Sequence, residues 1–508
     1  MSRLNRRKFL ATSAACSTFV LAGTRASGRV LGANDTVRIG VIGLNGRGKL
    51  HIEMATTTPG MTLAAVCDVD PAILARTLES SAVKKLDEDG HKVQGFADLR
   101  KMLESKDIDA VTVATPNHWH SLAAIWACQA GKDVLVEKPV SHNVWEGRQL
   151  VEAARKSGQI VQAGTQARAN PDLIEAVAWV HAGNLGKIRY AQGLCYNPRL
   201  SIGKVGHGQI PPGLDYDLWS GPVAVKPLTR EKLHYDWHWI YDYGNGDIGN
   251  QGIHEMDIAR WFLGYDTLSP RVMSIGGRLG YDDDGETPNT QLVYHDYDGP
   301  PLIFEVRGLP KSKEFQTDKI WQKNMDSPPG FPGKGGVAVE IVAEGGKFIV
   351  VHGGEILMAV DNDGKTIRDF VQADKRFAYA WRKGDHFLWT NWVSAMRSRK
   401  PADLKAPIVG AHLSSALGHM GTISHRLGQT MSDGAILERI QGNKLAAERF
   451  EAVKEHLAQN DVDLSKTPVT LGPWLTIDPK TERFVDNAAA NALARPEYRK
   501  PYVVPEAV

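Results

Sequence analysis

The feature that most constrains this chain is a β-rich run, Val37–Ile42, that leads directly into a glycine-rich turn and a helical stretch. The turn reads Gly43-Leu44-Asn45-Gly46-Arg47-Gly48. Glycine permits a tight turn and a close approach of the backbone to a pyrophosphate, whose charge is favoured at a helix N-terminus. Asn45 replaces the central glycine of the usual Gly-x-Gly-x-x-Gly pattern, and asparagine tolerates positive φ better than most residues. The segment predicts a dinucleotide-binding turn.

An acidic residue ends the next strand candidate, because Leu63–Cys67 runs into Asp68-Val69-Asp70. A carboxylate at Asp68 can accept hydrogen bonds from a ribose diol and repels a 2′-phosphate, so the sequence favours NAD over NADP. The alternative is that Asp68 caps the helix before Pro71, and one aspartate could do both.

Two more strand candidates, Ala110–Ala114 and Asp133–Val136, flank a helix candidate at His118–Ala130, and Asn117 suits the N-cap of that helix. Strands and helices that alternate at this spacing predict an α/β fold with a parallel, doubly wound sheet, the Rossmann arrangement. Ligands bind beyond the carboxyl ends of such strands. The polar residues expected there are Asn45, Asp68, Asn117 and Lys138.

Residues 1–33 are typical of an export signal. Asn5-Arg6-Arg7-Lys8-Phe9-Leu10 precedes an apolar run from Ala11 to Gly23 and a small-residue site, Thr24-Arg25-Ala26. The paired arginines predict recognition by the twin-arginine export machinery, and hence a periplasmic or otherwise exported protein. The apolar run is too short to be a stable membrane anchor. The alternative is a frayed amphipathic N-terminus.

The charge balance and the cysteine spacing argue against a nucleic-acid-binding protein and against a cysteine metal site. Sixty basic and 58 acidic residues leave a formal charge of +2, without the basic footprint of a protein that binds nucleic acid. One cysteine, Cys16, lies in the leader, and the other three have no metal-like spacing, so we expect buried free thiols. These three are Cys67, Cys128 and Cys195.

The motifs together resemble the glucose–fructose oxidoreductase, inositol dehydrogenase and MocA family. The resemblance covers roughly residues 37–428 and rests on six segments: Arg38–Gly43, Thr115–His120, Ala130–Lys132, Glu137–Pro139, Asn184–Ile188 and Gly249–Asp257. It implies a Rossmann domain followed by an α/β domain with a large, open, mostly antiparallel sheet. It also implies hydride transfer on a sugar, polyol or related alcohol.

The second half of the chain is consistent with that implication. Strand candidates separated by turn residues are Ile188–Cys195, Arg271–Ile275, Gln291–His295, Leu302–Val306 and Phe348–Val351. We therefore expect a leader at 1–33, a Rossmann NAD-binding domain at 34–168, a substrate and oligomerisation domain at 169–430, and a C-terminal extension at 431–508. A homo-oligomer is expected, and the extension should wrap a neighbour or its own domain.

The resemblance gives Lys138, in Glu137-Lys138-Pro139, a catalytic, alcohol-polarising role. A lysine near a dry pocket and a bound cation can have a lowered pKa, which allows proton exchange near neutrality. The alternative is an ion pair between Lys138 and Glu137, or a surface side chain.

A second catalytic element runs from Gly246 to Asp257. The family usually has an aspartate four residues before His254, where this chain has Asn250. On one helix, this spacing places both side chains on the same face. His254 titrates near neutrality and is the expected acid or base, whereas Asn250 cannot take a proton. Neighbouring Asp247 could compensate.

An aromatic run with interleaved polar side chains suits the C–H patches and hydroxyls of a sugar ring. Its candidate substrate residues are Trp237, His238 and Tyr241, with core packing as the alternative. Four residues of this region that could bind a metal match no zinc pattern, so no metal is expected. They are His234, His238, His254 and Glu255.

Gln166, Arg168 and Asn170 follow a strand candidate at Ile160–Ala163. The resemblance places such residues near the nicotinamide and the substrate, and an interdomain hinge is a compatible interpretation. The residues expected to contact the cofactor lie in the glycine-rich turn and at the ends of the strands. They are Gly43, Asn45, Gly46, Arg47, Gly48, Asp68, Thr115, Pro116, Asn117, His120, Glu137, Lys138 and Gln166.

Three functions fit these observations. The first is an exported NAD(P)-dependent oxidoreductase that acts on a saccharide or polyol with a tightly bound cofactor, since free NAD is scarce outside the cytoplasm. The second is a redox-neutral glycosidase that oxidises, eliminates, hydrates and re-reduces its substrate, as some members of the resembling family do. The third is a nucleotide-binding sensor without catalysis, against which Lys138 and His254 argue. Arg47 and the C-terminal extension are candidates for closing the pyrophosphate site.

Overall fold

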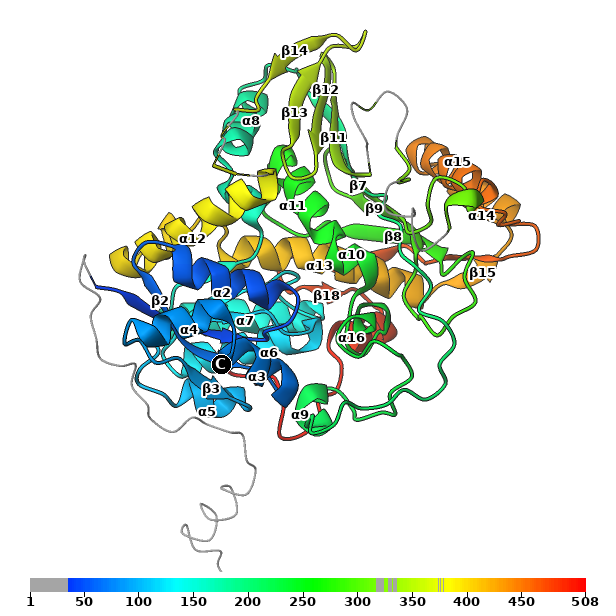
Figure 1. Ribbon diagram of the computed structural model, residues 1–508. Helices are drawn as coiled ribbons and strands as arrows, with labels where there is room; N and C mark the ends of the chain where they lie inside the picture. The colour runs from blue at the N-terminus through cyan, green and yellow to red at the C-terminus, as the bar shows by residue number, and fades with distance from the viewer. Residues whose placement is uncertain are drawn as a thin grey trace, which may run out of the picture.

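The computed structural model describes residues 35–316, 324–327, 331, 336–372, 374, 376–377 and 379–508. The predicted export signal lies outside the described residues. Within them, the chain forms two sheets of six and twelve strands. Figure 1 shows the smaller sheet with its helices in the lower part of the molecule and the larger sheet above it.

The smaller sheet confirms the predicted Rossmann domain. Its order is β3-β2-β1-β4-β5-β6, and every described pairing in it is parallel. The strands are β1 (Val37–Ile42), β2 (Met61–Cys67), β3 (Gln94–Phe96), β4 (Ala110–Val113), β5 (Asp133–Val136) and β6 (Val161–Ala163). The helices of this part are α2 (Arg47–Thr57), α3 (Pro71–Leu78), α4 (Ser81–Glu88), α5 (Leu99–Leu103), α6 (Asn117–Gln129) and α7 (Val144–Ser157).

The larger sheet is mixed but mostly antiparallel, as the resemblance implied, since β10 pairs in parallel with β7 while the other described pairings are antiparallel. Its strands are β7 (Ile188–Cys195), β8 (Arg271–Gly277), β9 (Thr290–Asp296), β10 (Leu302–Arg307), β11 (Val337–Ala343), β12 (Gly346–Val351), β13 (Ile356–Val360), β14 (Thr366–Asp369), β15 (Gln429–Met431), β16 (Val469–Leu471), β17 (Leu475–Asp478) and β18 (Arg483–Phe484). The helices after residue 170 are α8 (Pro171–His181), α9 (Tyr216–Ser220), α10 (Gly246–Asn250), α11 (Gly252–Leu263), α12 (Ala380–Ser398), α13 (Ile408–Arg426), α14 (Asp433–Ile440), α15 (Lys444–Ala458) and α16 (Ala488–Ala494).

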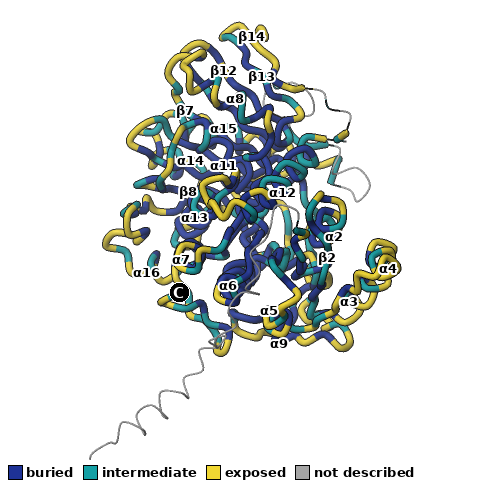
Figure 2. The backbone as a smooth tube through the Cα atoms, turned by 90° about the vertical axis from the view of Figure 1, so that its left-hand side faces the viewer, coloured by how far each residue is buried: buried dark blue, intermediate teal, exposed yellow. Residues whose placement is uncertain are grey.

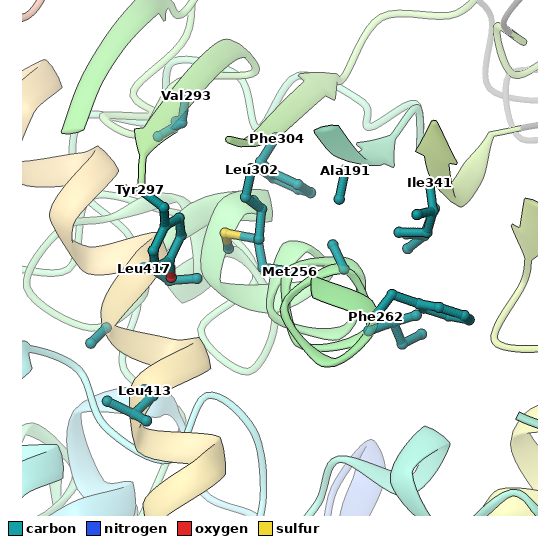
Figure 3. Close-up of a cluster of buried hydrophobic side chains, with 14 of the residues drawn as sticks. Ala191, Met256, Phe262, Val293, Tyr297, Leu302, Phe304, Ile341, Leu413 and Leu417 are labelled. Carbon is teal, nitrogen blue, oxygen red and sulfur yellow. The ribbon is translucent and has the colours of Figure 1, made fainter. Parts of the chain in front are cut away.

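The main core lies where α11 and α13 cover one face of this sheet. Figure 3 shows Met256 of α11 next to Leu302 of β10, with Leu417 of α13 on the other side of it, and Phe262 of α11 belongs to the same cluster. Each such side chain contributes about 1.5–3 kcal/mol when it is fully buried. In Figure 2 the buried interior continues through α6, α11 and α13, while α4 is largely exposed.

The Rossmann domain is completed by a helix from far along the chain. Trp389 and Trp392 of α12 are fully buried in the same hydrophobic cluster as Ile39 of β1. The domain is therefore not contained in 34–168 alone. Strand–helix alternation is a local pattern and cannot identify a packing helix two hundred residues downstream.

The C-terminal extension packs on its own chain. Its helices α14 and α15 cover part of the large sheet, where Phe450 and Ile436 contact the cluster around Met273. Its end returns to the Rossmann domain, where the Tyr502 ring lies 5.5 Å from that of Trp119. Figure 1 places the C-terminus beside this domain.

Cys67, Cys128 and Cys195 are buried free thiols, as predicted. Among the helices described, none has both the length and the apolar character needed to cross a membrane.

Candidate active site

A cavity of about 370 Å³ lies beyond the carboxyl ends of the Rossmann strands. It brings together most of the predicted cofactor residues with part of the aromatic run. The predicted residues that line it are Gly43, Asn45, Gly46, Arg47, Asp68, Thr115, Pro116, Asn117, His120, Glu137, Lys138, Trp237, His238 and Asn250.

The glycine-rich turn requires its glycines. Gly43 has φ +84°, and a Cβ there would lie 2.6 Å from the Ala114 carbonyl oxygen. A Cβ on Gly48 would lie 1.9 Å from the Gly43 oxygen. The N-terminus of α2 follows with Gly46 as its N-cap and no side-chain cap, so its positive end is open toward the cavity. This geometry fits a pyrophosphate.

The Asp68 carboxylate accepts a hydrogen bond from the backbone of the glycine-rich turn. Its Oδ2 accepts a hydrogen bond from the Leu44 amide at 2.9 Å, and its Oδ1 accepts one from the Asp70 amide at 3.0 Å. Burial raises the pKa of Asp68, and the two amide donors oppose this shift. The helix cap is a separate residue, because Asp70 accepts from Ala72 and Ile73 at the start of α3. The Asp68 carboxylate therefore remains at the cavity wall, with lone pairs free for a ribose diol.

The start of α6 differs from the sequence prediction, because Pro116 rather than Asn117 is the N-cap and no side chain caps the helix. Asn117 is the first helical residue, and its buried Oδ1 has no hydrogen-bond partner in the described part of the chain. His120, one turn later, lies between the carbonyl oxygens of Thr115 and Pro139 at 2.7 and 2.6 Å. It thus ties the turn after β4 to the loop that carries Lys138.

The second domain forms a roof over this cavity, made by the segment between β7 and α10. His234 Nε2 lies 2.8 Å from Asp70 Oδ2 on one side. On the other side, the Trp119 indole N–H donates to the Leu218 carbonyl of α9 at 3.1 Å. Leu218, Trp219, His234 and Tyr235 of this roof line the cavity.

The C-terminal extension fastens the roof from outside. Arg499 donates to Asp217 Oδ1 at 2.6 Å, to the Asp217 carbonyl at 2.8 Å and to the Val223 carbonyl at 3.1 Å. Tyr502 donates to Asp217 Oδ2 at 3.3 Å. We call this set, Asp217 with Arg499 and Tyr502, the clasp.

Arg47 and Glu137 belong to a buried ionic network. Arg47 lies 2.6 Å from Glu137 Oε1 and 2.6 Å from Asp385 Oδ1 of α12, and His51 Nε2 lies 3.0 Å from Glu137. Burial alone would raise the pKa of Glu137, but the Arg47 charge holds it well below its usual range. Arg47 therefore joins α12 to the strand end of β5, and its guanidinium is committed to carboxylates rather than free for a pyrophosphate.

Lys138 forms no side-chain ion pair with Glu137. Its Nζ donates to the Asn250 carbonyl oxygen at 2.6 Å and to Asn250 Oδ1 at 3.2 Å. Burial lowers the pKa of Lys138. An amine of reduced basicity at the wall of a cavity can accept and return a proton.

His238 presents a free nitrogen to the same cavity. Its ring stacks on that of Trp237, with centroids 3.7 Å apart, and its Nδ1 lies 2.5 Å from the Tyr235 carbonyl oxygen. A carbonyl only accepts, so Nδ1 carries the proton and Nε2 keeps a lone pair. Burial, followed by the Arg199 and Lys138 charges, lowers the pKa of His238 below its usual value. The ring is therefore a neutral imidazole at neutral pH.

The expectation that Asn250 and His254 share a face of one helix is wrong. Asn250 ends α10, and α11 starts at Gly252, with Gln251 as the break between them. His254 does not line the cavity, and its ring lies 4.8 Å from Trp381. Burial, followed by the Lys138 charge, lowers its pKa to about 3, and its buried Nδ1 has no partner among the described residues.

Glu255, beside His254, is a buried carboxyl group that the sequence considered only as a metal ligand. Its Oε1 accepts from the Gln251 amide at 3.1 Å, while Oε2 has no partner within the described part of the chain. Burial raises the pKa of Glu255 to about 8. The described residues contain no group of three or more side chains arranged to hold a metal.

Several predicted site residues do not line the cavity, and two of them form ion pairs with residues distant in sequence. Asp247 pairs with Arg199 at 2.9 Å, so it is not a spare base. Arg168 pairs with Asp257 at 2.7 Å, which replaces the expected substrate contact. The other residues that do not line the cavity are Gly48, beneath the turn; Gln166, packed against Gly384; Asn170, the N-cap of α8; and Tyr241, under Arg426.

The structure also adds residues that the sequence did not single out. Leu218, Trp219 and Tyr235 line the cavity from the roof. They lie in an irregular segment where no periodic pattern indicates which face is buried. Only the density of Trp, Tyr and His around them was a signal.

Two parts of the chain match one family. Residues 37–165 match "Oxidoreductase family, NAD-binding Rossmann fold", and residues 200–319 match "Oxidoreductase family, C-terminal alpha/beta domain".

Similar sequences include a "Glycosyl hydrolase family 109 protein" of Shewanella pealeana, 27% identical over 207 residues, which cover 37% of this chain and 45% of that protein. Another is scyllo-inositol 2-dehydrogenase (NAD(+)) of Bacillus subtilis, 31% identical over 234 residues, which cover 46% of this chain and 56% of the relative. The chain thus spans about half the length of these relatives.

Among solved structures, the WlbA dehydrogenase from Bordetella pertussis, in complex with NADH and UDP-GlcNAcA, matches with a TM-score of 0.53 at 18% identity, covering 77% of this chain and 97% of that one. Levoglucosan dehydrogenase, in complex with NADH and levoglucosan, matches with a TM-score of 0.52 at 16% identity, covering 76% and 98%. At this identity the likeness establishes the fold.

Proposed function

Since the chain belongs to the GFO/IDH/MocA oxidoreductase family, whose first domain is an NAD-binding Rossmann fold, we propose that it is an NAD-dependent enzyme that transfers hydride at a hydroxyl-bearing carbon of a saccharide or polyol. One observation carries this proposal: the Lys138 amine and the His238 imidazole line the same cavity as the dinucleotide turn.

The residues of the cavity fit NAD. The uncapped N-terminus of α2 and the close approach allowed by Gly43 suit its pyrophosphate, and the Asp68 carboxylate suits a ribose diol and disfavours a 2′-phosphate. The buried, unpartnered Oδ1 of Asn117 offers a further acceptor on the same wall. The chemistry that bound NAD supplies is the acceptance and return of a hydride.

The chain itself must handle the hydroxyl proton. Asn250 accepts the Lys138 hydrogen bond but cannot take a proton, and Asp247 is held by Arg199. We therefore assign proton acceptance to His238 Nε2, with Lys138 Nζ polarising the substrate oxygen. Trp237, stacked on His238, provides an apolar face for the C–H side of a sugar ring.

We also propose that the cofactor is retained through many turnovers and that the protein is exported with it. The support is the roof over the cavity, its clasp to the C-terminal extension, and the twin-arginine pattern of the leader. A retained cofactor requires an internally balanced reaction, in which a second carbonyl compound or the keto intermediate itself takes back the hydride.

The second candidate is a redox-neutral glycosidase. It is favoured by Asn250 in place of the family's aspartate and by the similarity to the glycosyl hydrolase family 109 protein. In this reaction the substrate is oxidised, loses its glycosidic oxygen by elimination, adds water and is reduced again, so no nicotinamide accumulates in either redox state.

One experiment distinguishes the candidates. The purified protein is incubated with a panel of monosaccharides, polyols and aryl glycosides, and both the reduced nicotinamide absorbance and sugar release are recorded. An oxidoreductase changes the absorbance with alcohols or carbonyl compounds, whereas the glycosidase releases sugar without a net change. Protein that gives neither signal and carries no nucleotide contradicts both.

The role of His238 as proton acceptor is tested by a substitution at that residue. His238→Gln keeps a hydrogen-bonding side chain but cannot exchange a proton, so kcat should fall by about 100- to 10,000-fold with little change in KM. Activity within a few-fold of wild type would exclude His238 as the base.

A further inference from the structure

A second cavity, of about 280 Å³, lies between the start of α7, helix α13 and the C-terminal extension. Its lining shares no residue with that of the first cavity. It is partly enclosed by the loop around Val223, while Ala492 of α16 and Tyr498 belong to its outer wall. In Figure 1, α16 lies near the end of α13 that forms the inner wall.

The floor of the second cavity contains neutral polar groups, one of which offers an unpartnered acceptor. Asn245 donates through Nδ2 to the His142 carbonyl at 3.0 Å, but its buried Oδ1 has no partner in the described part of the chain. His419 Nε2 lies 3.1 Å from Ser141 Oγ, and its Nδ1 lies 3.5 Å from Asn245 Nδ2. Burial lowers the pKa of His142 to about 4 and that of His419 to about 3, so both rings are neutral, and both nitrogens of His419 already have partners.

The remaining walls show which ligands do not fit. Lys226 and Asp242 pair at 2.5 Å and cancel each other's charge. Arg426, whose guanidinium lies 4.7 Å from the Tyr241 ring centre, forms no ion pair among the described residues. Glu146 and Glu497 add carboxyl groups to the lining. One unpaired cation beside them is too few for a phosphate-rich ligand, and the polar floor is unsuited to a lipid. The cavity wall alternates neutral donors and acceptors with apolar groups such as Leu493 and Ile423. This alternation matches a ligand that carries both hydroxyls and C–H patches.

We propose that the second cavity binds a neutral, polyhydroxylated ligand of the size of one sugar unit. The orphaned Asn245 Oδ1 accepts from a ligand hydroxyl, the Tyr241 hydroxyl completes the polar contacts, and Arg426 binds a ring oxygen or hydroxyl at the mouth. This site is independent of the chemistry proposed for the first cavity.

Two short segments contribute residues to both cavities. Lys138 is followed four residues later by His142, and His238 is followed three residues later by Tyr241. Lys138 and His238 line the first cavity, while His142 and Tyr241 line the second.

The test is calorimetric titration of the full chain with three neutral probes, D-galactose, N-acetyl-D-glucosamine and myo-inositol, and two anionic ones, D-glucuronate and phosphate. Ala492→Trp places a large ring into the second cavity, and Ala489→Trp, at another exposed position of the same helix that does not line the cavity, is its matched control. Trp237→Ala removes a side chain that lines the first cavity and not the second. Asn245→Leu, which removes the floor acceptor, gives a second variant should Ala492→Trp fail to fold.

We expect at least one neutral probe to bind in two events. One event should weaken at least about tenfold in Ala492→Trp and Asn245→Leu, the effect of losing about 1.4 kcal/mol, and persist in Ala489→Trp and Trp237→Ala. A single event that Trp237→Ala abolishes and Ala492→Trp leaves intact would overturn the proposal. Binding of glucuronate or phosphate alone, or of no probe, would overturn it as well.

Discussion

The clasp between the C-terminal extension and α9 predicts slow exchange of the cofactor, and Arg499→Ala tests it. The side chain makes three hydrogen bonds that hold Asp217 and Val223, while Leu218 and Trp219 of the same segment line the cofactor cavity. A dinucleotide under this roof leaves when α9 moves away from the Rossmann domain. Loss of the Arg499 side chain therefore lowers the free energy required for opening.

The free energy that Arg499→Ala removes depends on how exposed Arg499 and Asp217 are to solvent. The side chain of Asp217 is 59% exposed and that of Arg499 is 24% exposed, so solvent screens the pair. An exposed pair contributes about 0.2–1 kcal/mol, and each further hydrogen bond to a carbonyl contributes about 0.5–1.5 kcal/mol. With the two carbonyl bonds, a total of about 1–4 kcal/mol predicts release roughly 5- to 700-fold faster, since 1.4 kcal/mol corresponds to a factor of ten.

The assay loads the protein with NADH, removes free nucleotide by gel filtration, and follows the loss of bound NADH fluorescence after addition of excess NAD. Arg495→Ala is the matched control, because Arg495 pairs with the exposed Glu506 and has no contact with α9. Release from Arg499→Ala at the rate of wild type and of Arg495→Ala would refute the reasoning. So would a wild-type protein that loses its nucleotide during gel filtration.

Four further predictions concern the cavity and its surroundings. Asp68→Ala should weaken NAD binding and relax the preference against NADP; a wild type that binds NADP more tightly would contradict the assignment of Asp68. Lys138→Ala should reduce turnover by about 100- to 10,000-fold with the fold and most cofactor affinity retained, as circular dichroism and NADH titration would show. Asn250→Asp places a carboxylate 3.2 Å from Lys138 Nζ, so it should raise the pKa of Lys138 and move the basic limb of the rate profile up by about 1–3 pH units; an unchanged profile would exclude Lys138 as the titrating group. Glu255 is neutral in the folded protein up to a pKa of about 8 but ionises from its ordinary value of 4.5 when unfolded, so its contribution to stability is present below that value and is lost as pH rises toward 8. The free energy of unfolding of Glu255→Gln, relative to that of wild type, should therefore be higher at pH 8 than at pH 5, as denaturant melts would show. The same relative stability at both pH values would contradict this prediction.

The sequence by itself determined the Rossmann half of the molecule and the location of its binding edge. The bounds of β1, β5 and β7 coincide with the predicted runs, and Asp68 and Lys138 lie at the cavity as expected. These features depend on local causes. Strand residues alternate with helices over short distances, glycines are required where a Cβ would collide with a carbonyl, and parallel strands bring their ends to one edge.

Only the tertiary structure decided which polar side chains are available for chemistry. Arg168 and Asp247 looked equivalent to His238 in the sequence, but the first two are neutralised by partners 89 and 48 residues away, while the His238 ring keeps a free nitrogen at the cavity. The break at Gln251 likewise separates two residues that an uninterrupted helix would have aligned. A buried charge must find a counter-charge wherever the folded chain supplies one, and that partner has no fixed separation in sequence.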